Sequence, residues 1–181
     1  MSEQDLSLHP ADLARKVLQY YLKEGKLPQL PEPLPPEYQA RAGVFVSLKK
    51  GGQLRGCIGT FEPVRENLAE EIAANAVSAA VRDPRFPPVN EKELPDLDLS
   101  VDILGPVEKV ESKDQLDPKE YGIIVRRGSR SGLLLPDLEG VDTVEQQLEI
   151  ARRKAGIVPG ETAELYRFKV TRYPEKKGRD F

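Results

Sequence analysis

The segment LRGCIG, residues 54–59, places the only cysteine of the chain between two glycines, two positions after an arginine. Glycine weakens a strand, so two glycines beside a thiol predict that other atoms approach this backbone closely. If the segment is extended, Arg55 and Cys57 share one face while Gly56 and Ile58 lie on the other. A neighbouring guanidinium favours the thiolate form of cysteine. Cys57 and Arg55 are therefore the candidate catalytic residues.

The pattern around this segment predicts a β-hairpin. Residues 43–48 have the β-branched and aromatic content of a strand. Residues 49–52, Lys-Lys-Gly-Gly, supply the turn, and residues 53–60 return as the second strand. The candidate thiol is thereby assigned to a hairpin strand.

Cys57 has two interpretations at this point. The first is a small cysteine packed inside the strand, because unpaired cysteine is among the most buried residue types. The second is a functional strand, with a reactive thiol or with a backbone opened by glycine that grips a ligand. In that case Gly56, Ile58 and Gly59 are candidate binding residues together with Arg55.

A second polar motif follows at residues 83–88, Asp-Pro-Arg-Phe-Pro-Pro. A helix stop accounts for its prolines and for Phe86 as a core residue. It does not account for Asp83 and Arg85, a charge pair that prolines hold in a rigid loop. Fixed charges in rigid loops are typical of binding groups. Asp83 and Arg85 are therefore further candidate binding residues.

The rest of the pattern predicts an α+β fold with mainly antiparallel sheets and flanking helices. Helical spacing of apolar residues predicts helices over residues 10–24, 64–82 and 144–155, the last with a cap at Asp142-Thr143-Val144-Glu145. Further strands are expected over residues 97–104, 122–125, 132–135 and 163–173. The proline-rich segment from Leu27 to Pro36 is interpreted as a stiff connection.

The composition excludes several kinds of site. One cysteine and one histidine cannot make an internal disulfide or a metal site of several thiolates or imidazoles. A metal bound only by carboxylates is the remaining alternative, and because no motif marks one, no metal is predicted. The acidic start has no apolar run after it, and no stretch is apolar enough for a membrane span, which predicts a cytoplasmic protein. One domain is expected over residues 1–181, with its core from Leu13 to Tyr173 and a tail over Lys176–Phe181.

The charge distribution leaves one nucleic-acid alternative. A net charge of −3 argues against a DNA-binding protein. Residues 121–181 nevertheless carry more Lys and Arg than Asp and Glu, so RNA binding is retained as the weaker alternative. The residues that would form its basic patch are Arg126, Arg127, Arg130, Arg152, Arg153, Lys154, Lys176, Lys177 and Arg179.

The two motifs together resemble the AMMECR domain family, which includes the protein A component of AmmeMemoRadiSam systems. The resemblance runs from about Leu13 to Tyr173. Further matching pieces are Gly43–Val46, Gly132–Pro136, Lys154–Gly156 and Leu165–Phe168. Two departures are Asp137, where the family pattern has glutamine, and the lack of a tryptophan before the last strand.

The resemblance implies a larger and a smaller subdomain with a cleft between them near the Cys57 strand. It assigns no activity and no cofactor. It implies two partners, a Memo-like protein and a radical S-adenosylmethionine enzyme, because relatives are encoded beside them or fused to the former. The resulting hypothesis is a component of a multi-protein modification pathway whose cleft binds a small or nucleotide-like substrate. The alternative is a non-catalytic adaptor that docks a Memo-like metalloprotein.

Overall fold

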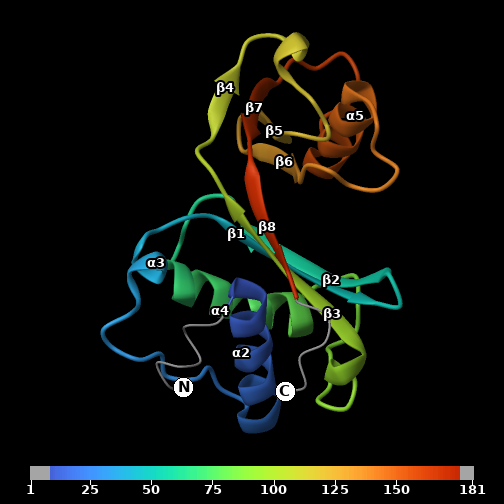
Figure 1. The fold of residues 1–181 in the computed structure, drawn as a ribbon. Coiled ribbons are helices and arrows are strands. Elements are labelled where there is room, and N and C mark those ends of the chain that lie inside the picture. Colours follow the sequence, from blue (N-terminus) through green and yellow to red (C-terminus); the bar gives the residue numbers. More distant parts are fainter. Residues whose placement is uncertain (1–8, 176–181) are drawn as a thin grey trace. The chain divides into compact units, whose positions relative to one another are not determined.

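The computed structural model describes residues 9–175, and the chain divides into two compact units (Figure 1). Of the described residues, the first unit comprises 9–103 and 172–175, and the second comprises Leu104–Thr171. They match the larger and smaller subdomains that the family resemblance implies. The predicted tail, Lys176–Phe181, lies outside the described residues, and the predicted cleft between the subdomains stays a prediction.

The first unit is a four-stranded sheet, in the order β2-β1-β3-β8, with helices on one face. Its elements are α2 (Pro10–Glu24), α3 (Pro36–Gln39), β1 (Val44–Lys50), β2 (Gln53–Thr60), α4 (Leu68–Val81), a short 3-10 helix (Leu94–Asp96), β3 (Leu97–Leu104) and β8 (Val170–Pro174). Helix α4 packs on β1 and β2, and α2 packs on α4. The predicted hairpin is confirmed as β1 and β2, which pair antiparallel.

The strand β1 turns its side chains alternately to the two faces of this sheet. Val44, Val46 and Leu48 are fully buried in the core formed with α2 and α4. Phe45 and Ser47 are half-buried and point to the opposite face. We call this opposite face, which carries Phe45, Ser47, Cys57 and Ser100, the thiol face. The period-two alternation of the sequence is sufficient to produce this division.

Helix α4 begins at Leu68, four residues later than predicted. Asn67 is extended, with φ −150° and ψ 167°, and its side chain accepts a hydrogen bond from the N–H of Glu70 at 2.9 Å. An asparagine in this role is a favourable N-cap, so the helix starts after it. The preceding N–H groups of Val64 and Arg65 donate instead to the buried carboxylate of Glu71, at 3.0 and 2.7 Å.

The second unit is a smaller sheet, in the order β4-β7-β5-β6, with one helix packed on β5 and β6. Its elements are β4 (Glu108–Val110), a 3-10 helix (Lys113–Gln115), β5 (Gly122–Arg127), β6 (Arg130–Leu134), α5 (Val144–Ala155) and β7 (Glu164–Phe168). The predicted hairpin of β5 and β6 is confirmed, with Arg127 opposite Arg130. The cap of α5 was predicted one residue too early, because Thr143 and Gln146 form the capping box.

The last predicted strand, residues 163–173, is two strands and not one. The chain leaves β7 after Phe168 and enters β8 at Val170, so only Lys169 separates them. β7 pairs with β5 and β4 in the second sheet, whereas β8 lies beside β3 in the first. A continuous apolar pattern does not reveal that a strand changes its partners.

Candidate functional site around Cys57

Cys57 lies on β2, an edge strand of the first sheet, and is half-exposed on the thiol face. It is paired with Ser47 on β1, and Ser47 is paired with Ser100 on β3. One thiol and two hydroxyls therefore form a row across three strands. The Ser47 hydroxyl donates a hydrogen bond to Cys57 Sγ at 3.2 Å. The sequence analysis missed both serines, although the alternation of the two predicted strands contained their position.

Asp83 and Arg85 bind the peptide groups of Cys57 from the free edge of β2. The N–H of Cys57 donates to Asp83 Oδ2 at 3.0 Å, and Arg85 Nη2 donates to the carbonyl oxygen of Cys57 at 3.2 Å. The two side chains also pair with each other, at 3.0 Å for Arg85 Nε to Asp83 Oδ1 and 2.8 Å for Nη2 to Oδ2. The two sequence motifs are thus one structural unit.

The contacts between Asp83 and Arg85 keep Asp83 in its ionised form. Hydrogen bonds from the Arg85 guanidinium, with smaller contributions from backbone N–H groups, hold the pKa of Asp83 well below its usual range despite burial. The same ion pair raises the pKa of Arg85, and the nearby Cys57 contributes to this rise. The side chain of Asp83 is 2% exposed and that of Arg85 is 54% exposed. The carboxylate is therefore enclosed, whereas the guanidinium reaches solvent.

Arg55 is engaged by a residue that the sequence analysis did not single out. Its Nε and Nη2 donate to the two carboxylate oxygens of Glu93, at 2.8 and 3.1 Å. Both side chains are 13% exposed, and the hydrogen bonds from Arg55 lower the pKa of Glu93. Arg55 is thus paired with a carboxylate, and its predicted effect on the thiol stays a prediction. The remaining Arg55 nitrogen, Nη1, is buried and lacks an acceptor among residues 9–175.

The glycines of residues 54–59 have a packing explanation. A Cβ on Gly56 would stand 2.2 Å from the carbonyl oxygen of Ala79, so α4 lies directly against this strand. Ile58 packs against the same core, on the face opposite Cys57. A Cβ on Gly59 would stand 2.3 Å from the ring of Phe45. The close approach that the glycines predict is confirmed, but the approaching atoms belong to the chain itself.

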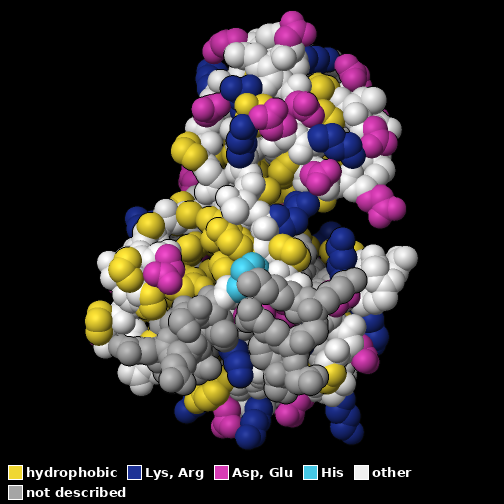
Figure 2. All heavy atoms as spheres, viewed as in Figure 1, with side chains coloured by type: hydrophobic (Ala, Val, Ile, Leu, Met, Phe, Trp, Pro, Cys, Tyr) yellow, Lys and Arg dark blue, Asp and Glu magenta, His cyan; other side chains and the backbone are white. Residues whose placement is uncertain are grey.

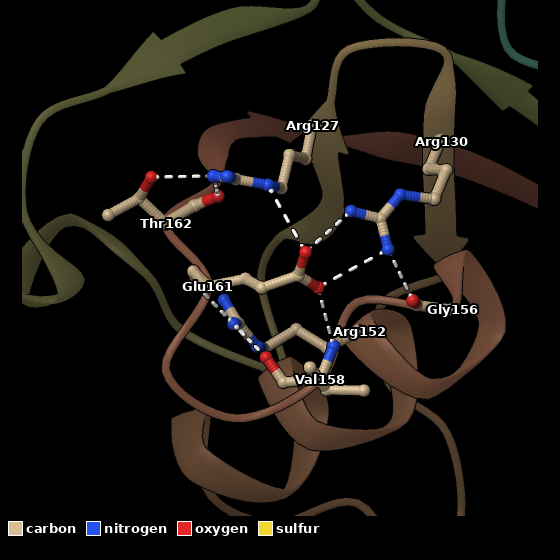
Figure 3. A network of polar contacts seen from close by, with 7 residues as sticks. All are labelled: Arg127, Arg130, Arg152, Gly156, Val158, Glu161 and Thr162. Atoms are coloured by element: carbon tan, nitrogen blue, oxygen red, sulfur yellow. Dashed lines mark hydrogen bonds and ion pairs between the residues drawn. The ribbon is translucent and has the colours of Figure 1, made fainter.

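The basic residues of the second unit are largely engaged with neighbours (Figure 3). Glu161 accepts hydrogen bonds from Arg130 at 2.7 and 3.2 Å and lies 3.4 Å from Arg127. Arg152 donates to the carbonyl oxygens of Val158 and Glu161. On the face seen in Figure 2, acidic and basic side chains are interspersed over this unit. Three of the predicted basic residues thus hold the loop after α5, and Lys176, Lys177 and Arg179 lie outside the described residues.

Within residues 9–175, no group of three or more His, Cys, Asp or Glu side chains is arranged to hold a metal ion. No helix in this described part of the chain has the length and apolar character that crossing a membrane requires. His9 packs edge-on against the ring of Tyr173, with 5.1 Å between the ring centroids.

Comparisons with known proteins place these features in a wider group. The AMMECR1 family model matches residues 11–176. A protein of Thermotoga maritima is 54% identical over 163 residues, which are 88% of this chain and 94% of that protein. A protein of Clostridium acetobutylicum is 51% identical over 165 residues, which are 90% of this chain and 35% of that longer protein.

A solved structure has the same fold. The crystal structure of an uncharacterised protein from Pyrococcus horikoshii matches with a TM-score of 0.85 and 35% sequence identity. The match covers 92% of this chain and 90% of the other. The predicted α+β fold is therefore confirmed.

Proposed function

Since the chain belongs to the AMMECR1 family, we propose that it is a cytoplasmic component of a multi-protein modification pathway that binds a small or nucleotide-like substrate. The binding surface is the thiol face around Cys57. The thiol lines the site and is its candidate nucleophile. A Memo-like protein and a radical S-adenosylmethionine enzyme are the proposed partners.

The row of Cys57, Ser47 and Ser100 is the observation that carries this proposal. A polar face alone is ordinary in an antiparallel sheet. Here the polar face presents a half-exposed nucleophilic atom with hydroxyl donors beside it, which is the composition that a polar ligand requires. The backbone under the thiol is also fixed by Asp83 and Arg85, and a fixed backbone favours a site of defined geometry.

The buried Nη1 of Arg55 supports the same location. A buried donor without an acceptor costs free energy, so such groups are rare in folded proteins. Arg55 is two residues from Cys57 on the same strand, and its other nitrogens are held by Glu93. A ligand oxygen that reaches this nitrogen after a small side-chain shift would satisfy it.

Protection of Cys57 from alkylation tests the proposal. The chain has one cysteine, so the rate of mass increase with iodoacetamide reports on this thiol alone. The probes are inorganic phosphate, mononucleotides and dinucleotides, each added separately. A ligand over the thiol slows the reaction because only the free protein reacts, and at ten times its Kd the rate falls about tenfold.

A pair of serine variants separates specific from general protection. Ser100→Ala removes one hydroxyl of the row and is expected to weaken protection. Ser129→Ala removes a hydroxyl from an exposed turn of the second unit and is expected to leave protection unchanged. If the thiol reacts in the folded protein and no probe slows it, or if it reacts only in urea, the substrate proposal is wrong.

A non-catalytic adaptor is the second candidate, and one observation favours it. The charges of both motifs are paired within the chain, and Gly56 and Gly59 are explained by packing. Light scattering with a Memo-like metalloprotein added to the wild type and to Cys57→Ser distinguishes the two functions. A complex that forms equally well with Cys57→Ser, measured by light scattering, favours the adaptor. RNA binding is less supported, because Arg127, Arg130 and Arg152 are engaged within their own unit.

A further inference from the structure

We propose that the ion pair of Asp83 and Arg85 is a positioning device for Cys57, which holds its peptide group on both sides and sets the charge balance at its thiol. The inference rests on the proposed function, because it assigns the pair to Cys57 rather than to the substrate. It also adds a role that the sequence does not indicate, since Arg85, and not only Arg55, is a cation close to Cys57.

The geometry of the pair is that of a substitute strand. An edge strand has free N–H and C=O groups that a neighbouring strand would bind. At Cys57 these two groups are bound by a carboxylate and a guanidinium, at 3.0 and 3.2 Å. The carboxylate also accepts the backbone N–H of Arg85 at 3.1 Å, which fixes the loop itself. The thiol therefore sits on a backbone held from outside the sheet.

Two ion pairs with different contacts lie near the thiol. Asp83 and Arg85 bind the peptide of Cys57 directly, whereas Arg55 and Glu93 bind each other. Lys50 also approaches Glu93, at 3.4 Å. On β3, two strands from Cys57 on the thiol face, Asp102 is paired with Arg172 at 2.8 and 2.9 Å. Asp83 and Arg85 are paired with each other, so removing one of them leaves the other without this partner, whereas Glu93 without Arg55 would keep Lys50.

Removing the charge of Asp83 and removing the charge of Arg85 are therefore expected to shift the pH midpoint of Cys57 alkylation in opposite directions. Asp83→Asn keeps an oxygen for the N–H of Cys57 but leaves the Arg85 cation unopposed, which favours the thiolate. Arg85→Gln leaves the Asp83 carboxylate unopposed, which disfavours the thiolate. The measurement is the rate of alkylation of Cys57 by iodoacetamide as a function of pH. The midpoint is expected to fall by about half a pH unit or more in the first variant and to rise similarly in the second.

Opposite shifts of the alkylation midpoint in Asp83→Asn and Arg85→Gln would show that the two charges act on the thiol, rather than only holding the loop in place. Mere loosening of the loop would expose the thiol in both variants and change both rates in the same direction. Arg85→Lys keeps the charge and is expected to restore the midpoint. Arg55→Gln is the matched control, with an expected shift smaller than that of Arg85→Gln. Urea unfolding of each variant establishes that the alkylated state is folded.

Shifts of the same sign in the two variants, or a larger shift for Arg55→Gln than for Arg85→Gln, would overturn the inference. These outcomes are independent of the substrate proposal, which fails when no probe protects the thiol. A positioned thiol without a protecting ligand would uphold the inference and contradict the proposed substrate site.

Discussion

Gly56 illustrates how one missing side chain determines the distance between a helix and a sheet. In Gly56→Ala, the new Cβ would meet the Ala79 carbonyl oxygen at 2.2 Å, and backbone atoms on both sides would have to move. Such overpacking costs about 1–3 kcal/mol. The gain from restricting the unfolded chain is only about 0.4–1 kcal/mol. We therefore expect a lower urea midpoint for this variant, with net destabilisation.

The control is a glycine at which an added Cβ would make only an ordinary contact. At Gly105 the nearest atom to an added Cβ is a carbonyl oxygen at 3.4 Å, an ordinary contact. Gly105→Ala is expected to leave the free energy of unfolding unchanged or to raise it by less than about 1 kcal/mol. Equal stability of Gly56→Ala and the wild type would contradict the packing explanation.

At the same scale, the two motifs that the sequence singled out lie together in the structure, whereas the contacts between them could not be predicted. The alternation of β1 and β2 places Cys57 opposite Ser47, but the register shifts between Leu48 and Lys49, so Arg55 is an extra residue in β2 and the predicted shared face of Arg55 and Cys57 stays a prediction. The role of Glu93 depends on where a distant loop returns, which no local pattern contains. Asp83 and Arg85 were selected because packing did not explain their charges, but their contact with the peptide of Cys57 required the structure.

At the scale of elements, Glu161 links the hairpin of β5 and β6 to the loop after α5. Hydrogen bonds from Arg130 and from the N–H of Val158 lower the pKa of Glu161 from 4.5 to about 2. A group whose folded pKa is depressed stabilises the fold above its unfolded pKa, and this contribution disappears as pH falls through the folded pKa. The stability difference between wild type and Glu161→Gln should therefore shrink as pH falls from about 5 to about 2.

The measurement is the free energy of unfolding in urea at several pH values for both proteins. Glu149→Gln is the control, because its pair with Arg153 on α5 is exposed, with side chains 70% and 72% exposed. A difference between wild type and Glu161→Gln that stays constant down to pH 2 would contradict the role of this pair.

Some boundaries of helices and strands could be predicted from neighbouring residues, and others could not. The stop of α2 at Gly25, in the left-handed conformation with φ 72°, was predictable because glycine favours it. The start of α4 was predicted four residues too early, because Asn67 is the residue that caps the helix. The division of residues 163–173 between two sheets depends on pairing partners, which a single strand does not specify.

At the scale of the whole molecule, the first unit is built from two segments, because the chain leaves it after Ile103 and returns to it at Arg172. Arg15 of α2 forms an ion pair with Glu175, just after β8, and also donates to the carbonyl oxygens of Leu94 and Leu97. Glu175 in turn accepts the N–H of Leu99 at 2.8 Å. One carboxylate thus joins the first helix, a central strand and the returning end of the chain.

Removal of this carboxylate is expected to destabilise the first unit strongly. In Glu175→Ala, Arg15 keeps its buried position, with its side chain 11% exposed, but loses its counter-charge. Breaking a buried ion pair in this way costs about 3–5 kcal/mol. Glu149→Ala removes the same kind of partner from an exposed arginine and should cost less than about 1 kcal/mol. Urea unfolding compares the two, and similar small losses would show that the return of the chain is held by the pairing of β8 with β3 rather than by Glu175.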